Sequence, residues 1–232
     1  MKILAIECSH YVAGVAVKNG DLLVERVNDN WQKTAEAIVP LMASVMLDAG
    51  LVPAELDGIV VSAGPGSFTA LRIGMSVAKG VAFGAGRPLV PVSTMLSMGV
   101  AAFSHTDALY VVPVIPSRLG EYYYTVYRRS SAKGVPEEVD SARCLSVELF
   151  ARLAPFSGEF VIAGRNIDEL VRQDGQLAPF CIEASFFTAA SLLTLVGNEL
   201  EGGFSGALAE AVPDYRQQFV PARKTRPGTS KI

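Results

Sequence analysis

AGPGSFTALRIG, residues Ala63–Gly74, joins two elements that decide how the first half of the chain folds. The run before it, Asp57–Ser62 (DGIVVS), is short and apolar, as expected of a buried strand. The segment after it, Phe68–Ala85, has apolar residues around the whole circumference of a helix. The glycines and proline between them mark a tight turn. We interpret the stretch as a strand-to-helix turn that shapes a packing and partner-binding surface.

Periodicity on either side of this turn predicts alternating strands and helices. An Asn-Gly pair at Asn19 separates two apolar runs, which is a strong hairpin signal. Thr34 is a plausible N-cap for a helix that Gly50 would end, and Ser93 can cap a third helix. The predicted strands are Lys2–Glu7, Val12–Lys18, Leu22–Val27, Asp57–Ser62 and Pro88–Val92, and the predicted helices are Thr34–Ala49, Phe68–Ala85 and a segment from Ser93 to about Ser104.

The second half of the chain has a similar but less regular order of predicted strands and helices. Its predicted strands are Leu109–Val114, Tyr122–Arg128 and Phe160–Ala163, its predicted helices are Ser146–Leu153, Ile167–Gln173 and Thr188–Glu201, and Pro136–Leu145 is either a loop or an edge strand. We therefore expect an α/β protein with two lobes, residues 1–106 and 107–232, each with a mixed sheet flanked by helices. The basic tail, residues 217–232, is expected to be poorly ordered.

Composition narrows the function classes. Half of the 232 residues are hydrophobic, and 20 Lys and Arg against 23 Asp and Glu give a net charge of −3. This charge provides no global basic field that would attract nucleic acid. The three cysteines are far apart, without zinc-site spacing, which fits a reducing compartment. No signal peptide is recognised, and Arg72 and Lys79 interrupt the longest apolar stretch, so we expect a cytoplasmic protein.

Two helices, Thr34–Ala49 and Phe68–Ala85, are more apolar than a surface helix normally is. Val39 and Leu47 lie off the core stripe of the first, and the second contains three glycines that each cost roughly 0.5–1 kcal/mol relative to alanine. Either the helices are buried within the monomer, or they also form an interface, which we favour. The predicted interface residues are Ile38, Leu41, Met42, Val45, Met46, Phe68, Thr69, Leu71, Arg72, Met75 and Lys79.

No catalytic constellation is recognisable. The chain has two histidines and no HExxH or paired Cys/His ligands. Ser67 does not lie in a GxSxG elbow, and the GPGS turn lacks the lysine of a P-loop. The start of a helix still attracts anions, so phosphate binding at this turn stays open. If the chain were a kinase or ATPase, we would expect it to bind nucleotide through Glu7, Ser9, Gly64, Gly66, Ser67 and Arg118.

Five motifs together resemble the TsaB (YeaZ) family. They are KILAIECS at the start, SAGPGSFTALRIG, PLVPVST, SRLGEYY and the late PDYR, and they span nearly the whole chain. The resemblance implies the actin/Hsp70/sugar-kinase (ASKHA) fold. It also implies a role in making threonylcarbamoyladenosine on tRNA, with a TsaD-like transferase as heterodimer partner through the first two helices. A TsaE-like ATPase would join the assembly, the chain alone would form a homodimer, and tRNA would bind only through the complex.

Comparison with TsaD-like enzymes implies a non-catalytic paralogue. Thr94 and Met98 stand where those enzymes have two metal-binding histidines, and neither residue is a good imidazole substitute. Residues Pro116–Gly120 stand where a glycine-rich phosphate turn is usual. We expect no catalytic residues, no metal site and no peptidase activity, no cofactor required by this chain, and room for ATP or ADP at the interface of the complex. A stand-alone ATP-binding kinase or ATPase is the alternative.

Overall fold

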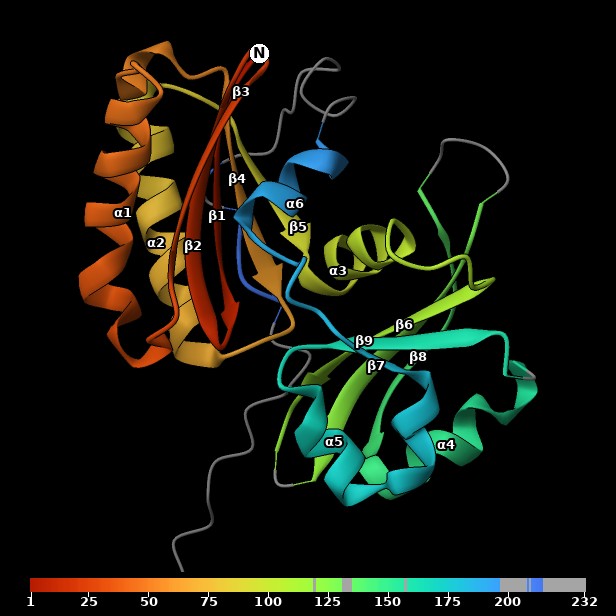
Figure 1. Cartoon of the computed structure of the whole chain (residues 1–232). Helices are drawn as coiled ribbons and strands as arrows, with labels where there is room; N and C mark the ends of the chain where they lie inside the picture. Colours follow the sequence, from red (N-terminus) through yellow and green to blue (C-terminus); the bar gives the residue numbers. More distant parts are fainter. Residues whose placement is uncertain (119, 131–134, 157, 197–207, 209, 215–232) are drawn as a thin grey trace, which may run out of the picture.

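Two five-stranded sheets form the two halves of the molecule (Figure 1). The computed structural model describes residues 1–118, 120–130, 135–156, 158–196, 208 and 210–214. The strands of the first sheet are β1 (Lys2–His10), β2 (Val12–Asn19), β3 (Leu22–Asn28), β4 (Gly58–Gly64) and β5 (Leu89–Ser93). Those of the second sheet are β6 (Tyr110–Pro116), β7 (Glu121–Arg128), β8 (Glu137–Leu145), β9 (Phe160–Gly164) and β10 (Cys181–Glu183).

The two sheets share one topology. The first has the order β3-β2-β1-β4-β5 and the second β10-β9-β6-β7-β8, so the same order recurs when strands are counted from the start of each half. β1 is antiparallel to β2 and parallel to β4, and β6 is likewise antiparallel to β7 and parallel to β9. This duplication confirms the predicted two-lobed fold of the actin/Hsp70/sugar-kinase type.

Six helices cover the sheets in the described part of the chain. They are α1 (Thr34–Asp48), α2 (Phe68–Ala85), α3 (Thr94–Phe103), α4 (Ser146–Leu153), α5 (Ile167–Gln173) and α6 (Ala189–Leu192). α1 and α2 lie side by side on the outer face of the first sheet, and α4 and α5 lie on the outer face of the second (Figure 1). α3 and α6 lie between the two sheets, where α3 contacts β6 and α6 contacts β1 and β2.

The helix α2 has the predicted bounds because its end signals are strong. The side chain of Ser67 accepts a hydrogen bond from the backbone N–H of Ala70 at 3.5 Å, which caps the first turn. Gly86 ends the helix in a left-handed conformation, with φ of 64°. The buried stripe of α2 packs with α1 against the first sheet in one continuous apolar core.

Several details differ from the sequence-based expectation. Pro136–Leu145 proves to contain the edge strand β8, and the three-residue strand β10 was not predicted. Thr34 is already helical because a 3-10 turn, Trp31–Lys33, leads directly into α1, so Lys33 occupies the cap position. The predicted helix Thr188–Glu201 is shorter: α6 ends at Leu192, a 3-10 turn follows, and residues 197–201 lie outside the described residues.

The end of the described chain returns to the first lobe. α6 contacts β1 and β2, and Ala211 is buried in the core beneath α1 and α2. The division into residues 1–106 and 107–232 stays a prediction, and the basic tail 217–232 lies outside the described residues. Across the part of the chain that is described, no helix is long and apolar enough to cross a membrane.

Candidate functional site

The outer face of α1 and α2 carries large apolar side chains that the lobe leaves exposed. Leu47 is 79% exposed and Phe83 is 81% exposed, and about half of Val39 and of Phe68 is exposed. Exposed apolar groups gathered on one face are typical of a protein–protein contact. We define the outer face by exposed residues of the two helices, which are Glu36, Val39, Pro40, Ala43 and Leu47 of α1 and Phe68, Thr69, Arg72, Ser76, Gly80, Phe83 and Gly84 of α2.

The three helical glycines of α2 have different surroundings. A Cβ on Gly74 would collide with the Cys8 Sγ atom, so this glycine lets α2 approach β1 closely. A Cβ on Gly80 or Gly84 would meet nothing within 4 Å. Packing within the described chain therefore accounts for Gly74 and does not account for the other two, which lie on the outer face.

The structure separates the predicted interface residues into three groups. Ile38, Val45, Met46, Leu71 and Met75 are buried in the core of the first lobe and offer no surface to a partner. Leu41, Met42 and Lys79 are half-buried. Phe68, Thr69 and Arg72 are exposed on the outer face.

These assignments have one physical cause: the regular apolar stripe of each helix faces the sheet. The residues that break the stripe, Val39, Leu47 and Phe83, are the ones that reach the surface. An apolar residue off the core stripe is therefore the better sequence signal for an exposed apolar face.

Arg72 is the charged residue that α2 places on the outer face, and Glu36 is the one from the first turn of α1. The Arg72 guanidinium carbon lies 3.7 Å from the centroid of the Phe68 ring, a cation–π contact on the first turn of α2. Elsewhere along this side, Asp48 at the end of α1 is paired with Arg26 of β3 at 2.6 Å. The outer face thus has an apolar centre with charge at its margins, the pattern of a protein interface.

The predicted nucleotide residues Glu7 and Ser9 lie at the carboxyl end of β1 and contact each other. The Glu7 Oε1 atom accepts hydrogen bonds from the Ser9 backbone N–H at 2.8 Å and from the Ser9 hydroxyl at 2.5 Å. Both residues are fully buried. Glu7 Oε2 has no hydrogen-bond partner among the described residues.

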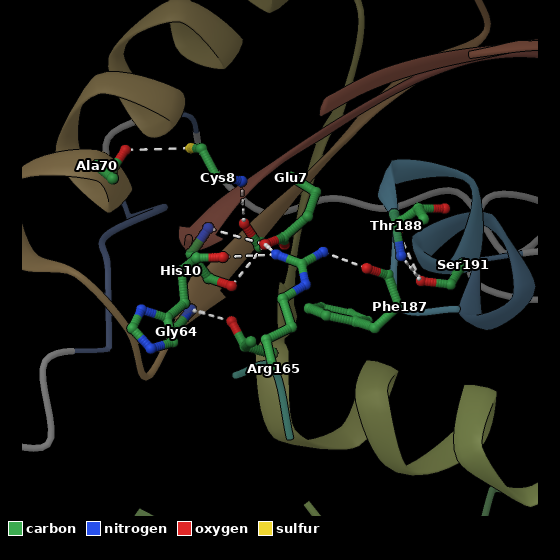
Figure 2. A network of polar contacts seen from close by, with 12 residues as sticks. Glu7, Cys8, His10, Gly64, Ala70, Arg165, Phe187, Thr188 and Ser191 are labelled. Carbon is green, nitrogen blue, oxygen red and sulfur yellow. Dashed lines mark hydrogen bonds and ion pairs between the residues drawn. The ribbon is translucent and has the colours of Figure 1, made fainter. Parts of the chain in front are cut away.

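A residue from the second lobe, Arg165, completes this site (Figure 2). Its Nη1 atom lies 3.7 Å from Glu7 Oε1 and donates to the carbonyl oxygen of His10 at 2.6 Å. Its Nη2 atom donates to the carbonyl oxygen of Phe187. Burial, and secondarily the charge of Arg165, lowers the pKa of His10 to about 3, so this imidazole is neutral near pH 7.

The GPGS turn packs against the same end of β1. The Ser67 N–H donates to the Ser9 carbonyl oxygen at 2.6 Å, and a Cβ on Gly66 would collide with that oxygen. Gly64 has φ of +113°, and its N–H donates to the Thr94 hydroxyl at 3.1 Å. The glycines of this turn therefore have packing roles. Arg118 is exposed in the turn before β7 and joins none of these contacts in the described structure.

A family model described as "TsaD: tRNA N6-adenosine threonylcarbamoyltransferase" matches residues 30–212. The tRNA threonylcarbamoyladenosine biosynthesis protein TsaB of Escherichia coli (strain K12) is 30% identical over 235 residues, which covers 97% of this chain and 98% of that protein. The chain belongs to the TsaB (YeaZ) family. The protein of the same name from Haemophilus influenzae is 32% identical over 135 residues, 57% of this chain and 56% of that one.

Solved structures agree with the TsaB-family fold. The structure titled "YeaZ from Pseudomonas aeruginosa" has a TM-score of 0.75 at 23% identity, covering 92% of this chain and 99% of that chain. A second structure from that organism, described as a protein with similarity to peptidase YEAZ, has a TM-score of 0.78 at 22% identity and covers 93% and 99% of the two chains. At 22% and 23% identity, the similarity to these two structures supports the fold alone.

In this TsaB-family chain the two positions compared with metal-binding histidines are interior. Thr94 is buried and accepts the hydrogen bond from Gly64, and Met98 packs in the core between the lobes. Within the described residues, no three His, Cys, Asp or Glu side chains are grouped so that they could hold a metal ion.

Arg165 is the residue of this site that the sequence did not reveal. It lies in an ordinary strand-to-helix turn, and its partners His10 and Phe187 are 155 and 22 residues away.

Proposed function

We propose that this chain is a non-catalytic scaffold and activator subunit for the synthesis of threonylcarbamoyladenosine on tRNA. In this role it pairs with a TsaD-like threonylcarbamoyltransferase. The observation that carries the proposal is the outer face of α1 and α2, where Leu47 and Phe83 are each about four-fifths exposed. Family membership supplies the pathway, since the relatives above are named for threonylcarbamoyladenosine biosynthesis.

The outer face suits a partner helix pair. Gly80 and Gly84 leave room for a backbone to approach α2, and Leu47 and Phe83 provide apolar anchors on either side of the same face. When the enzyme is absent, a second copy of this chain covers the same surface as a homodimer. A TsaE-like ATPase joins the complex, tRNA binds through the assembled complex, and the assembly works in the cytoplasm.

Nucleotide is assigned to the assembly and not to this chain alone. The carboxylate that would hold Mg-nucleotide, Glu7, is buried, accepts a hydrogen bond from Ser9 and forms an ion pair with Arg165. A Cβ on Gly64 or Gly66 would collide with a neighbouring backbone oxygen, so both glycines pack against the chain's own backbone. We therefore propose that ATP or ADP, where the assembly uses it, binds at the interface with the partner enzyme, and that this chain requires no cofactor of its own.

The first prediction tests the outer face by substituting Phe83→Asp. A desolvated aromatic anchor contributes about 2 kcal/mol or more to binding, so the affinity for the TsaD-like protein of the same organism falls by about 30-fold or more. Calorimetric titration of purified partners measures it. The matched control is Val147→Asp on α4, where the side chain is 63% exposed and lies on the other lobe.

Far-UV circular dichroism checks that both variants keep the fold, as expected because both side chains are largely exposed in the single chain. Equal affinity of Phe83→Asp and wild type would refute the proposed face. An aspartate at Met75 could not serve as this test, since Met75 is only 4% exposed and the change would disrupt the core.

A further inference from the structure

A single side chain, Arg165, joins the end of β9 to the end of β1 and to the segment that leads into α6. It follows directly after β9 and is 8% exposed. Its guanidinium contacts the His10 carbonyl and the Glu7 carboxylate at the end of β1, and the Phe187 carbonyl in the segment that leads into α6 (Figure 2). The guanidinium carbon also lies 4.9 Å from the centroid of the Phe187 ring. One cation therefore bridges three segments that meet between the lobes.

The backbone turns on either side of this contact are also held together. Tyr11 and Asn166 are the two non-glycine residues with positive φ in the described chain, at 56° and 55°. Asn166 Nδ2 donates to the Tyr11 hydroxyl at 3.5 Å and to Glu169 at 3.3 Å. Such conformations persist only where the surroundings hold them in place. Each lobe thus contributes one constrained turn, and the turns meet beside Arg165.

The charges of Arg165 and Glu7 make separation of the two groups energetically unfavourable. Glu7 is fully buried, and Arg165 is the cation that the described structure places next to it. Separating the lobes would leave a carboxylate without its counterion and two carbonyl groups without their donors. The closed arrangement is therefore favoured by the chain's own residues.

The contact lies at a position where α/β proteins commonly bind a ligand. In open α/β sheets, ligands bind outside the carboxyl ends of the strands. Here the carboxyl ends of β1 and β9 converge, and Arg165 fills the space between them. We propose that Arg165, Glu7 and the carbonyl groups of His10 and Phe187 form an inter-lobe latch, which holds the two lobes in one arrangement without any bound ligand.

The experiment measures the distance between the lobes by double electron–electron resonance. Spin labels are placed at Asp21→Cys, in the exposed turn after β2, and at Val147→Cys on α4. Cys181→Ser removes the partly exposed native thiol, while Cys8 and Cys144 are buried, and burial raises the pKa of both thiols so that they label slowly. Labelled chain is diluted with unlabelled chain to suppress distances between copies.

With the latch intact, the distance distribution is narrow and does not change when ATP and Mg²⁺ are added. Arg165→Met widens it toward longer distances. Adding Glu7→Gln to Arg165→Met narrows it only in part, because the buried carboxylate no longer lacks a counterion but the carbonyl groups of His10 and Phe187 still lack their donor. Arg26→Met, which breaks an arginine–carboxylate pair within the first lobe, leaves the distribution unchanged.

Two results would overturn the latch. One is a distribution that stays as narrow in Arg165→Met as in wild type. The other is a broad wild-type distribution that narrows only with ATP. If Arg165→Met does not fold, Arg165→Lys is measured instead, since it keeps the charge but cannot reach all three acceptors. An intermediate width supports the latch, and a wild-type width refutes it.

Discussion

His10 has an environment that keeps its imidazole neutral. Burial is the larger cause that lowers its pKa to about 3, and the positive charge of Arg165 acts in the same direction. Its ring lies 3.7 Å from the ring of Tyr11, between centroids, and the Nε2 atom has no hydrogen-bond partner within the described chain. A proton on this ring would bring a second cation next to Arg165. The neutral state of His10 is therefore part of what lets Arg165 contact the end of β1.

This environment predicts a pH dependence of stability. In the unfolded chain the histidine has a pKa near 6.5, so the unfolded state takes up a proton below that pH while folded His10 stays neutral down to about pH 3. The free energy of unfolding then falls as the pH drops from 6.5 toward 3, and this residue contributes no slope above 6.5. Urea unfolding measures the loss, about 2 kcal/mol between pH 7.5 and pH 5 from this residue.

The control for this dependence is His10→Phe, which keeps a ring against Tyr11 and cannot be protonated. Carboxylates titrate in both proteins, so the difference between the two curves isolates His10. Parallel curves for wild type and His10→Phe from pH 7.5 to pH 5 would contradict the assignment.

The helix α2 shows how far sequence predicted an element and where that prediction stopped. Its bounds could be predicted because Ser67 and Gly86 are local signals at its two ends. The side of the helix that faces water could not be predicted, because both sides are apolar and the sheet beneath the helix decides which side is buried. The same limit explains β10, since three residues are too few to show a strand's alternation. Arg165 was missed because its role depends on partners distant in sequence.

Substitutions at the glycines of α2 should have opposite effects. Gly74→Ala places a Cβ against the Cys8 Sγ atom and should destabilise the fold by about 1–3 kcal/mol. Gly80→Ala meets open space in the described structure and should stabilise the isolated chain by about 0.5–1 kcal/mol, because alanine favours helix. Urea unfolding at pH 7.5 measures both changes, at a protein concentration low enough that the chain is monomeric.

A second substitution separates the steric effect from helix propensity. Adding Cys8→Ala to Gly74→Ala removes the colliding sulfur, so the double variant should be more stable than the sum of the two single changes predicts. Simple additivity would show that Cys8 is not what requires glycine at this position.

At the scale of the whole molecule, the duplicated topology follows from sequence patterns of hairpin, helix and parallel strand that recur in each half. Those patterns are local, so the two-lobed fold could be predicted. How the lobes meet is not local. It depends on Arg165, on the segment through Phe187 that returns to the first lobe, and on the packing of α3 and α6 between the sheets. Together these contacts fix how the carboxyl end of β1 meets the residues that follow β9.

The closed arrangement predicts that ATP with Mg²⁺ does not stabilise the isolated chain. A ligand at 100 times its dissociation constant adds about 2.7 kcal/mol to the free energy of unfolding, which for a protein of this size is a shift in Tm of roughly 5–10 °C. We expect a shift near zero for wild type at millimolar ATP, because Glu7 is already paired with Arg165. Thermal unfolding followed by circular dichroism measures it. A shift of several degrees that Glu7→Gln abolishes would contradict this expectation, and would show that nucleotide reaches the end of β1 despite Arg165.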